Sequence, residues 1–450
     1  MIINNKIVLL ITALLILASS CRKSDIVIDD ENLLSDDGSG TGTITWTKDK
    51  NYILDGFVFV NPGQTLTIEP GTVIRAKTGQ GEKASALIVA RGGKIIAQGT
   101  KDEPIIFTVE DDDLEGSVPL EARGLWGGII ILGNAQLNTE FNEARIEGIP
   151  LFESRGIYGG NNNNDNSGIL KYVSIRHGGT NIGDGNEING LTLGGVGSGT
   201  TIENVEVISN EDDGFEFFGG NVNCKYLVSA FCGDDAFDFD QGYRGKGQFF
   251  LAIQAPSLGD HLAEHDGGTD PVWGEPLSIP EIYNATYIGN GILSSAELMT
   301  FADNAGGKYY NSIFINQTQG VLVEYITGFN DSYYQFISGN LKIENNIFYN
   351  IENNLQQNIF SIYTRTSEDI TEEQLLLQNY FEQANNLMTD PQIEITETEY
   401  HLIPQGEVSG NLASYPESWF EEVNYKGAFD PAGDDWINGW TLLSQSGKIK

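Results

Sequence analysis

Basic residues and long apolar runs are both scarce in this chain, and each shortage excludes a class of function. Only 25 lysines and arginines oppose 63 aspartates and glutamates, which leaves a formal net charge of −38. Such a chain repels phosphate backbones and anionic lipid headgroups, so nucleic acid is excluded as a partner. No apolar run after residue 20 approaches the roughly 20 residues that a membrane-spanning helix needs. The acidic excess instead favours divalent cations or basic partners.

Cysteine is also scarce, and the first of the three cysteines, Cys21, ends a distinctive N-terminal segment. A polar start, an apolar run over residues 7–17 and three small residues precede it. This order is typical of a secretion signal over residues 1–20. The small residues before Cys21 resemble the lipobox of bacterial lipoproteins, although Ala18 stands where leucine is usual. The resemblance implies lipidation at Cys21 and an anchor in a Gram-negative outer membrane; plain secretion with an incidental cysteine is the alternative.

Residues 21–43 are rich in aspartate, serine, glycine and threonine, which predicts a flexible acidic tether. Acidic residues close behind a lipidated cysteine resemble the signal that sends some lipoproteins to the outer face of the outer membrane, so a cell-surface location is implied. The two remaining cysteines, Cys224 and Cys232, lie eight residues apart. Because an exported protein can form disulfides, the spacing leaves two alternatives open, a disulfide around a turn or two buried thiols.

Short β-runs punctuated by glycine and proline follow the tether, with no helical period between them, and they predict an all-β fold. The segments "LTIEPGTVI", "ALIVARGGKIIAQGT", "PIIFT" and "GLWGGIIILG" occur in this order between residues 66 and 133. They resemble the opening coils of right-handed parallel β-helices of the pectin-lyase-like superfamily. That resemblance implies a solenoid in which equivalent side chains of successive coils stack on one another.

Internal repeats support the same fold. Three similar acidic segments occupy residues 211–220, 233–242 and 259–268, at offsets of 22 and 26 residues that suit one coil each. A second pattern, a polar or aromatic residue followed by alternating β-formers, recurs from Tyr172 to Asn345. Together the repeats predict a right-handed parallel β-helix over residues 44–350.

The repeats end near residue 350, and the last hundred residues predict a small mixed cap over residues 351–450. A capping-box pattern at Thr371 starts a helix over residues 374–384, with Leu375, Leu376 and Phe381 expected to be buried. We expect the aromatic tail beyond it to pack over the last coil, because a solenoid must cover its open ends. A separate aromatic ligand-binding module is the alternative.

The acidic repeats carry the chemistry. If their phenylalanines point inward, strand alternation places Glu216, Asp238 and Glu264 in one outward column and Asp240 with Asp266 in the next. At the preceding turn, Asp212, Asp234 and Asp260 form a column beside Asp213, Asp235 and His261. Neighbours about 4.8 Å apart repel by roughly 3 kcal/mol at an effective dielectric constant of about 20.

Calcium suits several carboxylates and tolerates irregular geometry. A calcium site is therefore predicted from Asp212, Glu216, Asp234, Asp238, Asp240, Glu264 and Asp266. The alternative is that the carboxylates splay into water or pair with flanking lysine and arginine.

Two classes of function fit these columns. Pectin-lyase-like enzymes use clustered aspartates and a basic residue on acidic polysaccharides, which would make Asp213, Asp234, Asp235, His261 and Arg244 the catalytic candidates. The ordered motifs of the polygalacturonases are absent, so a non-catalytic binding surface is the simpler hypothesis. "HLAEH" at residues 261–265 matches an inverted zinc-protease motif, but that chemistry needs a helix, and the surrounding glycines and prolines predict a strand.

Taken whole, the lipobox, acidic tether, "IEPGTVI" opening, "GDDAFDFDQGYRGKGQ" centre and "YKGAFDPAGDDWINGWT" ending resemble a leptospiral group of β-helix outer-membrane lipoproteins. The resemblance implies an outer-membrane or surface component that acts beside TonB-dependent receptors, with no established reaction. The first hypothesis is thus a surface lipoprotein that binds a glycan, a cation-bridged ligand or such a receptor. Its expected face is the acidic columns with Tyr243, Arg244 and Trp273. The second is a polysaccharide lyase or hydrolase.

Overall fold

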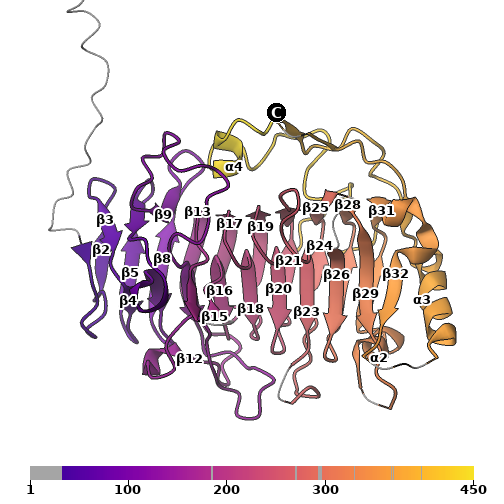
Figure 1. Ribbon diagram of the computed structural model, residues 1–450, viewed down its shortest axis with the longest axis horizontal. Helices are drawn as coiled ribbons and strands as arrows, with labels where there is room; N and C mark the ends of the chain where they lie inside the picture. The colour runs from indigo at the N-terminus through magenta and orange to yellow at the C-terminus, as the bar shows by residue number, and fades with distance from the viewer. Residues whose placement is uncertain are drawn as a thin grey trace, which may run out of the picture.

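A computed structural model shows a parallel β-helix, confirming the fold class expected from the sequence (Figure 1). The structure describes residues 33–183, 186–268, 271–291, 296–328, 330–365, 367, 369–396 and 398–450. The secretion signal, Cys21 and most of the tether lie outside these residues. Two long parallel sheets of ten and nineteen strands wrap around one apolar core. No helix in the described part of the chain is long and apolar enough to cross a membrane.

Each coil contributes one strand to the ten-stranded sheet. Its strands are β4 (Phe57–Val60), β7 (Ala86–Val89), β10 (Ile129–Leu132), β16 (Leu191–Gly194), β18 (Phe215–Phe218), β20 (Phe237–Asp240), β23 (Ala263–Asp266), β26 (Glu297–Ala302), β29 (Gln319–Glu324) and β32 (Phe360–Tyr363).

The nineteen-stranded sheet is formed by the remaining part of each coil. Its strands are β1 (Leu33–Leu34), β2 (Ile44–Trp46), β3 (Tyr52–Leu54), β5 (Thr65–Ile68), β6 (Val73–Ala76), β8 (Lys94–Gln98), β9 (Ile105–Val109), β13 (Gly168–Arg176), β17 (Thr201–Ile208), β19 (Asn223–Ala230), β21 (Lys246–Gln248), β22 (Leu251–Ile253), β24 (Glu281–Tyr283), β25 (Thr286–Gly291), β27 (Gly307–Tyr310), β28 (Ile313–Gln317), β30 (Leu341–Glu344), β31 (Ile347–Ile351) and β33 (Leu387–Met388).

The second repeat pattern of the sequence marks a corner in this larger sheet. Its polar or aromatic residues, among them Asn204, Tyr226 and Asn284, have φ values of 54°, 57° and 54°. Asparagine tolerates this left-handed conformation better than most residues, so it recurs at this bend, although tyrosine or phenylalanine occupies it on three coils, at Tyr172, Tyr226 and Phe249. The corner separates the two short strands of a coil, such as β24 and β25.

Aromatic side chains of the acidic repeats point inward and stack along the solenoid. The ring of Phe215 lies 5.3 Å from that of Phe237, and Phe217 lies 5.1 Å from Phe239. All four rings are fully buried. This stacking confirms the predicted register, because one inward ring every second residue turns the intervening acidic residues outward.

The solenoid is longer at both ends than the expected residues 44–350. At the start, Leu33 and Leu34 pair with Ile53 and Leu54, so the end of the expected flexible tether belongs to the first coil. At the other end, β32 pairs with β29, and β33 pairs with β31. Backbone pairing continues here although the side-chain repeat has faded.

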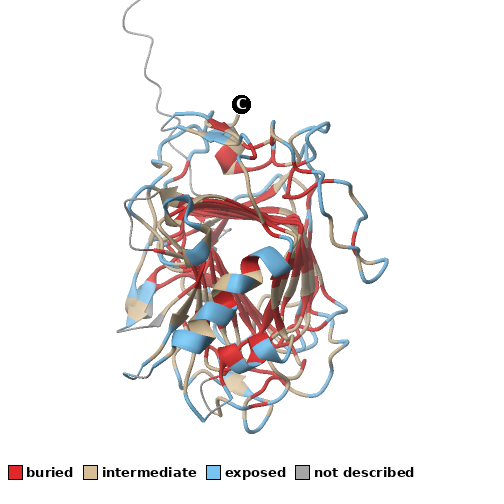
Figure 2. Ribbon diagram, turned by 90° about the vertical axis from the view of Figure 1, so that its right-hand side faces the viewer, coloured by how far each residue is buried: buried red, intermediate tan, exposed pale blue. Residues whose placement is uncertain are grey.

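Helix α3 (Thr371–Gln383) covers the last coil, as Figure 2 shows, and confirms the expected helix. Phe381 packs against Phe348 and Phe360 at ring distances of 5.5 and 6.2 Å. Leu377 is buried beside it, whereas Leu375 and Leu376 are exposed, which corrects their expected burial. Thr371 is the first helical residue and its backbone N–H donates to Asp369 Oδ1 at 3.2 Å, so the expected capping box is not formed. The other α-helices of the described residues are α2 (Ser332–Ile337) and α4 (Leu442–Gln445).

The aromatic tail does not cover the last coil, contrary to the prediction. It runs back along the outer face of the larger sheet, and α4 lies near β13 and β17 (Figure 1). Trp436 packs on Tyr226 at 5.2 Å, and Trp440 packs on Tyr172 at 5.5 Å. The physical reason is that this outer face is apolar and needs a cover. It presents Ile208, Val228, Ala230, Leu251, Ile253, Ile288, Ile313, Ile315 and Ile347.

Cys224 and Cys232 are both free and buried, so the disulfide alternative is wrong and the buried-thiol alternative is right. Most of strand β19, with the corner at Tyr226, lies between them. Burial raises the pKa of the Cys232 thiol to about 11, which keeps it protonated and unreactive.

Candidate metal site

Strands β18, β20 and β23 carry the predicted outward column. Glu216 pairs with Asp238, and Asp238 pairs with Glu264, in parallel register. Phe218 pairs with Asp240, one step along the strand, and alternation places Asp266 beside Asp240 on the next coil. These strands lie side by side in the ten-stranded sheet (Figure 1). The sequence prediction of the column is confirmed.

The turn before each strand forms a second column that hydrogen bonds from coil to coil. The backbone N–H of Asp235 donates to Asp213 Oδ1 at 2.9 Å, and the backbone N–H of His261 donates to Asp235 Oδ1 at 2.6 Å. Strand register extends this column in both directions, to Asn189 before it and to Glu297 after it. We call the acidic members of both columns and their neighbours the acidic ladder: Asp212, Asp213, Glu216, Asp234, Asp235, Asp238, Asp240, Asp260, Glu264 and Asp266.

The ladder has an inner and an outer layer. Asp213, Glu216 and Asp235 are 8%, 6% and 2% exposed, whereas Asp234 and Asp260 lie in water. One carboxylate oxygen from each of Asp213, Glu216 and Asp238 lies within 4.8 Å of the other two. A second such group consists of Asp212, Asp213 and Asp234. Asp213 therefore links the two layers.

Two further side chains reach the inner layer from outside the repeats. The Asn189 amide donates to Glu216 Oε2 and, at 3.1 Å, to Glu147 Oε1. Glu147 itself comes from the loop between β11 (Ala144–Arg145) and β12 (Ile157–Tyr158). The sequence held a signal for Asn189, since "NGLTLGG" is a degenerate copy of the "DGFEFFGG" repeat, but none for Glu147.

The inner carboxylates are held in a setting that opposes their ionisation. Burial, followed by the charges of Glu147 and Asp238, raises the pKa of Glu216 well above its usual range. Burial and neighbouring carboxylates raise the pKa of Asp212 to about 7 and that of Asp266 to about 8. Asp238 Oδ1 and Asp266 Oδ1 are buried and accept no hydrogen bond from any described residue. Without a cation these groups must share protons.

No lysine or arginine among the described residues forms an ion pair with the inner layer. Beside the ladder, Arg123 Nε lies 3.9 Å from Glu211 Oε2. Arg123 lines an open pocket of about 710 Å³ over the outer layer, together with Gln80, Asn181, Glu187, Glu211, Asp212 and Asp234. The ladder thus opens into a solvent-filled pocket large enough for a sugar-sized ligand.

Arg244 and Tyr243, expected on the working face, lie elsewhere. Arg244 donates to the carbonyls of Gly220 and Gly242 and, at 2.9 Å, to Asn163 Oδ1. Tyr243 is buried in the core, where its hydroxyl donates to a backbone carbonyl and its ring packs on Phe217. The predicted catalytic set is therefore not assembled around Arg244. Trp273 is 68% exposed.

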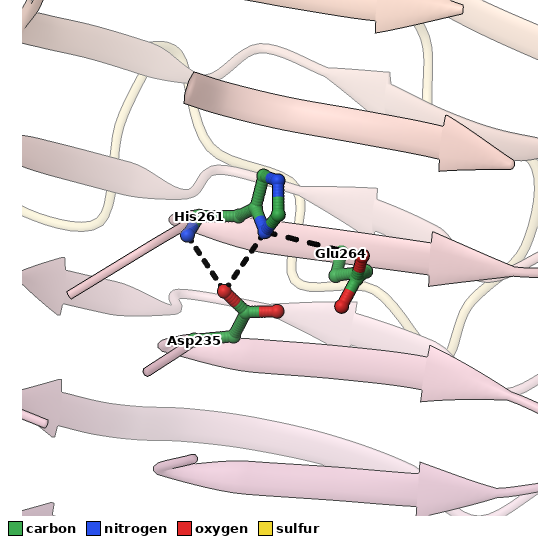
Figure 3. A group of neighbouring side chains, drawn as sticks. All are labelled: Asp235, His261 and Glu264. Atoms are coloured by element: carbon green, nitrogen blue, oxygen red, sulfur yellow. Dashed lines mark hydrogen bonds and ion pairs between the residues drawn. The ribbon is translucent and has the colours of Figure 1, made fainter. Parts of the chain in front are cut away.

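His261 belongs to the ladder, whereas His265 does not, as Figure 3 shows for His261 with Asp235 and Glu264. His261 Nδ1 lies 3.0 Å from Asp235 Oδ1 and 4.0 Å from Glu264 Oε1. His265 points into the core, stacks on Phe301 at 4.1 Å and contacts the Tyr309 hydroxyl. Burial lowers the pKa of His265 to about 3. His261, in the turn before β23, faces the acidic ladder and His265 faces the core, so the zinc-protease geometry is absent.

The family model of the pectate-lyase-like β-helix domain matches residues 38–389. The chain belongs to that family. The matched residues include every strand of both long sheets except β1, and all of the acidic ladder. Comparisons with curated proteins and with solved structures give no significant match. Family membership thus supports the β-helix fold and leaves the function to be argued from the site.

Proposed function

We propose that this protein is a non-catalytic, lipid-anchored surface protein that binds calcium on the acidic ladder and, through the calcium, an acidic glycan. The observation that carries the proposal is the convergence of Asp213, Glu216 and Asp238. Their oxygens lie within 4.8 Å of one another, and no basic side chain of the described residues neutralises them. A hard divalent cation offsets that repulsion and prefers oxygen ligands.

The pocket over the outer layer suits the proposed binding of an acidic glycan. Asp212 and Asp234 line it, and Arg123, Gln80 and Asn181 supply hydrogen-bond donors at its rim. A uronate carboxylate can complete the coordination of a partly exposed calcium ion, since calcium accepts six to eight oxygens. A glycan bound in this way would depend on calcium for its affinity.

The anchor and the location belong to the same proposal. They rest on the lipobox-like residues before Cys21 and on the resemblance to the leptospiral lipoproteins, which also points to a TonB-dependent receptor as partner. Incorporation of labelled fatty acid into the expressed full chain tests the anchor. Cys21→Ser should abolish the incorporation and release the protein from the membrane fraction.

Calcium binding is tested by calorimetry on the purified mature chain, followed by binding assays on a panel of polyuronates with and without calcium. Glu216→Gln and Asp238→Asn should weaken both calcium and polyuronate binding, whereas Asp102→Asn, an exposed carboxylate outside the ladder, should leave both unchanged. Calcium binding that survives both ladder substitutions contradicts the proposal. The same incubations test the alternative of a lyase or hydrolase: unsaturated or newly reducing products that disappear in Asp235→Asn would show catalysis.

A further inference from the structure

In the second column, which follows the turns before the strands, His261 stands where the neighbouring coils carry a carboxylate. The column passes through Asp213, Asp235, His261 and Glu297 on four successive coils. Equivalent residues of neighbouring coils lie about 4.8 Å apart, so His261 is flanked by a carboxylate on either side. Calcium makes little use of nitrogen ligands, whereas imidazole suits zinc, iron, nickel and copper.

The buried carboxylate of Asp235 fixes the orientation of the His261 ring. Its Oδ1 lies 2.6 Å from the His261 backbone nitrogen and 3.0 Å from His261 Nδ1. A proton on Nδ1 satisfies the second contact, and this tautomer leaves a lone pair on Nε2. Figure 3 shows that the second ring nitrogen points away from Asp235 and Glu264. Metal-binding histidines are commonly held in this way, with one nitrogen on a carboxylate and the other on the ion.

Two carboxylates are placed to join the imidazole. Glu297 Oε2 lies 3.9 Å from His261 Nε2, and Asp260 Oδ2 lies 3.9 Å from Nδ1. The Glu297 distance is too long for a hydrogen bond but suits two atoms on one ion, since ligand bonds of about 2.0–2.2 Å allow separations up to about 4 Å, whereas Asp260 lies beside the nitrogen that contacts Asp235. One ligand atom from each of Asp260, His261 and Glu297 lies within 4.8 Å of the other two.

The three side chains also have the accessibility that a loaded site requires. The side chains of His261 and Glu297 are 12% and 17% exposed, which holds them in place, and that of Asp260 is 57% exposed, which leaves an entry path. We propose that Asp260, His261 and Glu297 bind a divalent transition-metal ion, with Asp235 as the positioning residue for His261. The site is separate in ligand chemistry from the all-oxygen calcium site proposed above.

Cobalt(II) and zinc(II) are the probes for this site, added to the untagged mature chain. Visible absorption of bound cobalt reports the coordination, and calorimetry reports the zinc affinity. His261→Gln should lower the zinc affinity at least about 100-fold and abolish the cobalt bands, and Asp235→Asn should lower it about 10- to 100-fold. Glu297→Gln, which keeps the side-chain volume, should weaken binding as well. His401→Gln, at a half-exposed histidine outside the ladder, should change neither.

Separate readouts distinguish this proposal from calcium binding. Glu216→Gln should weaken calcium binding and leave the cobalt bands in place, whereas His261→Gln should do the reverse. Cobalt binding that persists in a folded His261→Gln protein, with unchanged bands, overturns the proposal. Cobalt binding that is lost in Glu216→Gln but kept in His261→Gln also overturns it, because the ion then occupies the calcium ladder. Circular dichroism of each variant without metal confirms that the coils are intact.

Discussion

Glu206 and Glu216 lie ten residues apart on the two sheets of the solenoid, both are buried, and their surroundings differ completely. The Glu206 carboxylate accepts from the backbone N–H groups of Leu442 and Leu443 at 2.7 and 3.0 Å and from the Ser174 hydroxyl at 2.5 Å. Ser174 in turn accepts from Arg176 Nε at 2.8 Å. Among the described residues, the Glu216 carboxylate accepts a hydrogen bond from the Asn189 amide and otherwise faces carboxylates.

The contrast shows what each face of the solenoid does. On the larger sheet the chain covers the face with its own tail and supplies donors to the buried Glu206 carboxylate. On the ten-stranded sheet it gathers charges of one sign, and no lysine or arginine among the described residues pairs with Asp213, Glu216 or Asp238. The first arrangement holds the fold together, whereas the second costs stability and is explained by a ligand. Removing a charge should therefore have opposite effects on the two faces.

Replacement of Glu206 by alanine should have the largest effect. It leaves the N–H groups of Leu442 and Leu443 without their acceptor and Arg176, which is 2% exposed, without a counter-charge. Breaking a buried pair from one side costs about 3–5 kcal/mol, so urea unfolding should show a loss of that order and early release of the tail. Glu206→Gln, which keeps one acceptor oxygen, should lose less. A Glu206→Ala variant as stable as the wild type would show that Glu206 does not stabilise the fold.

Replacement of Glu216 by glutamine should have the opposite sign. In metal-free protein at pH 8 it removes repulsion from Asp238 and Glu147 while keeping an acceptor for Asn189. The free energy of unfolding should rise by about 1–3 kcal/mol, the scale of one like-charge contact at a dielectric constant near 20. In saturating calcium the order should reverse, with the wild type the more stable. Equal stability of both proteins under both conditions would mean that the ladder neither suffers repulsion at Glu216 nor binds calcium there.

The pH dependence of stability tests whether the acidic ladder costs stability in the absence of a cation. Asp212 and Asp240 have pKa values of about 7 and Asp266 of about 8, above the value near 4 of an unfolded aspartate. Between these values the folded state binds more protons than the unfolded state, so metal-free stability should fall as the pH rises from about 4 to about 8. Excess calcium should flatten that fall. Thermal unfolding at pH 5, 6.5 and 8 with and without calcium measures both effects.

The periodicity of the sequence decides which of these structural features could be predicted. The offsets of 22 and 26 residues and the alternation of phenylalanine with acid fixed the register of Glu216, Asp238 and Glu264, because stacked coils repeat side-chain positions. The path of the tail obeys no period, since it depends on an apolar outer face that appears only after the coils have formed. Glu147 could not be predicted for the same reason. It reaches Glu216 from a loop whose length and direction leave no pattern in the sequence.

The smallest effect is expected for Asp234, in the outer layer of the ladder. Partial burial, followed by the charges of Asp260 and Glu264, raises the pKa of Asp234, but its side chain is exposed, so water screens these charges and a substitution should change stability by less than about 0.5 kcal/mol. Asp234→Asn should therefore unfold like the wild type in metal-free buffer, yet bind calcium more weakly, because Asp234 shares an oxygen cluster with Asp212 and Asp213. Calorimetry and urea unfolding on the same sample separate the two quantities.

Unchanged calcium affinity would confine the cation to the inner layer, around Asp213, Glu216 and Asp238. A large gain in metal-free stability would instead show that the repulsion extends outward into the solvent-exposed layer, so that depth of burial does not divide the ladder.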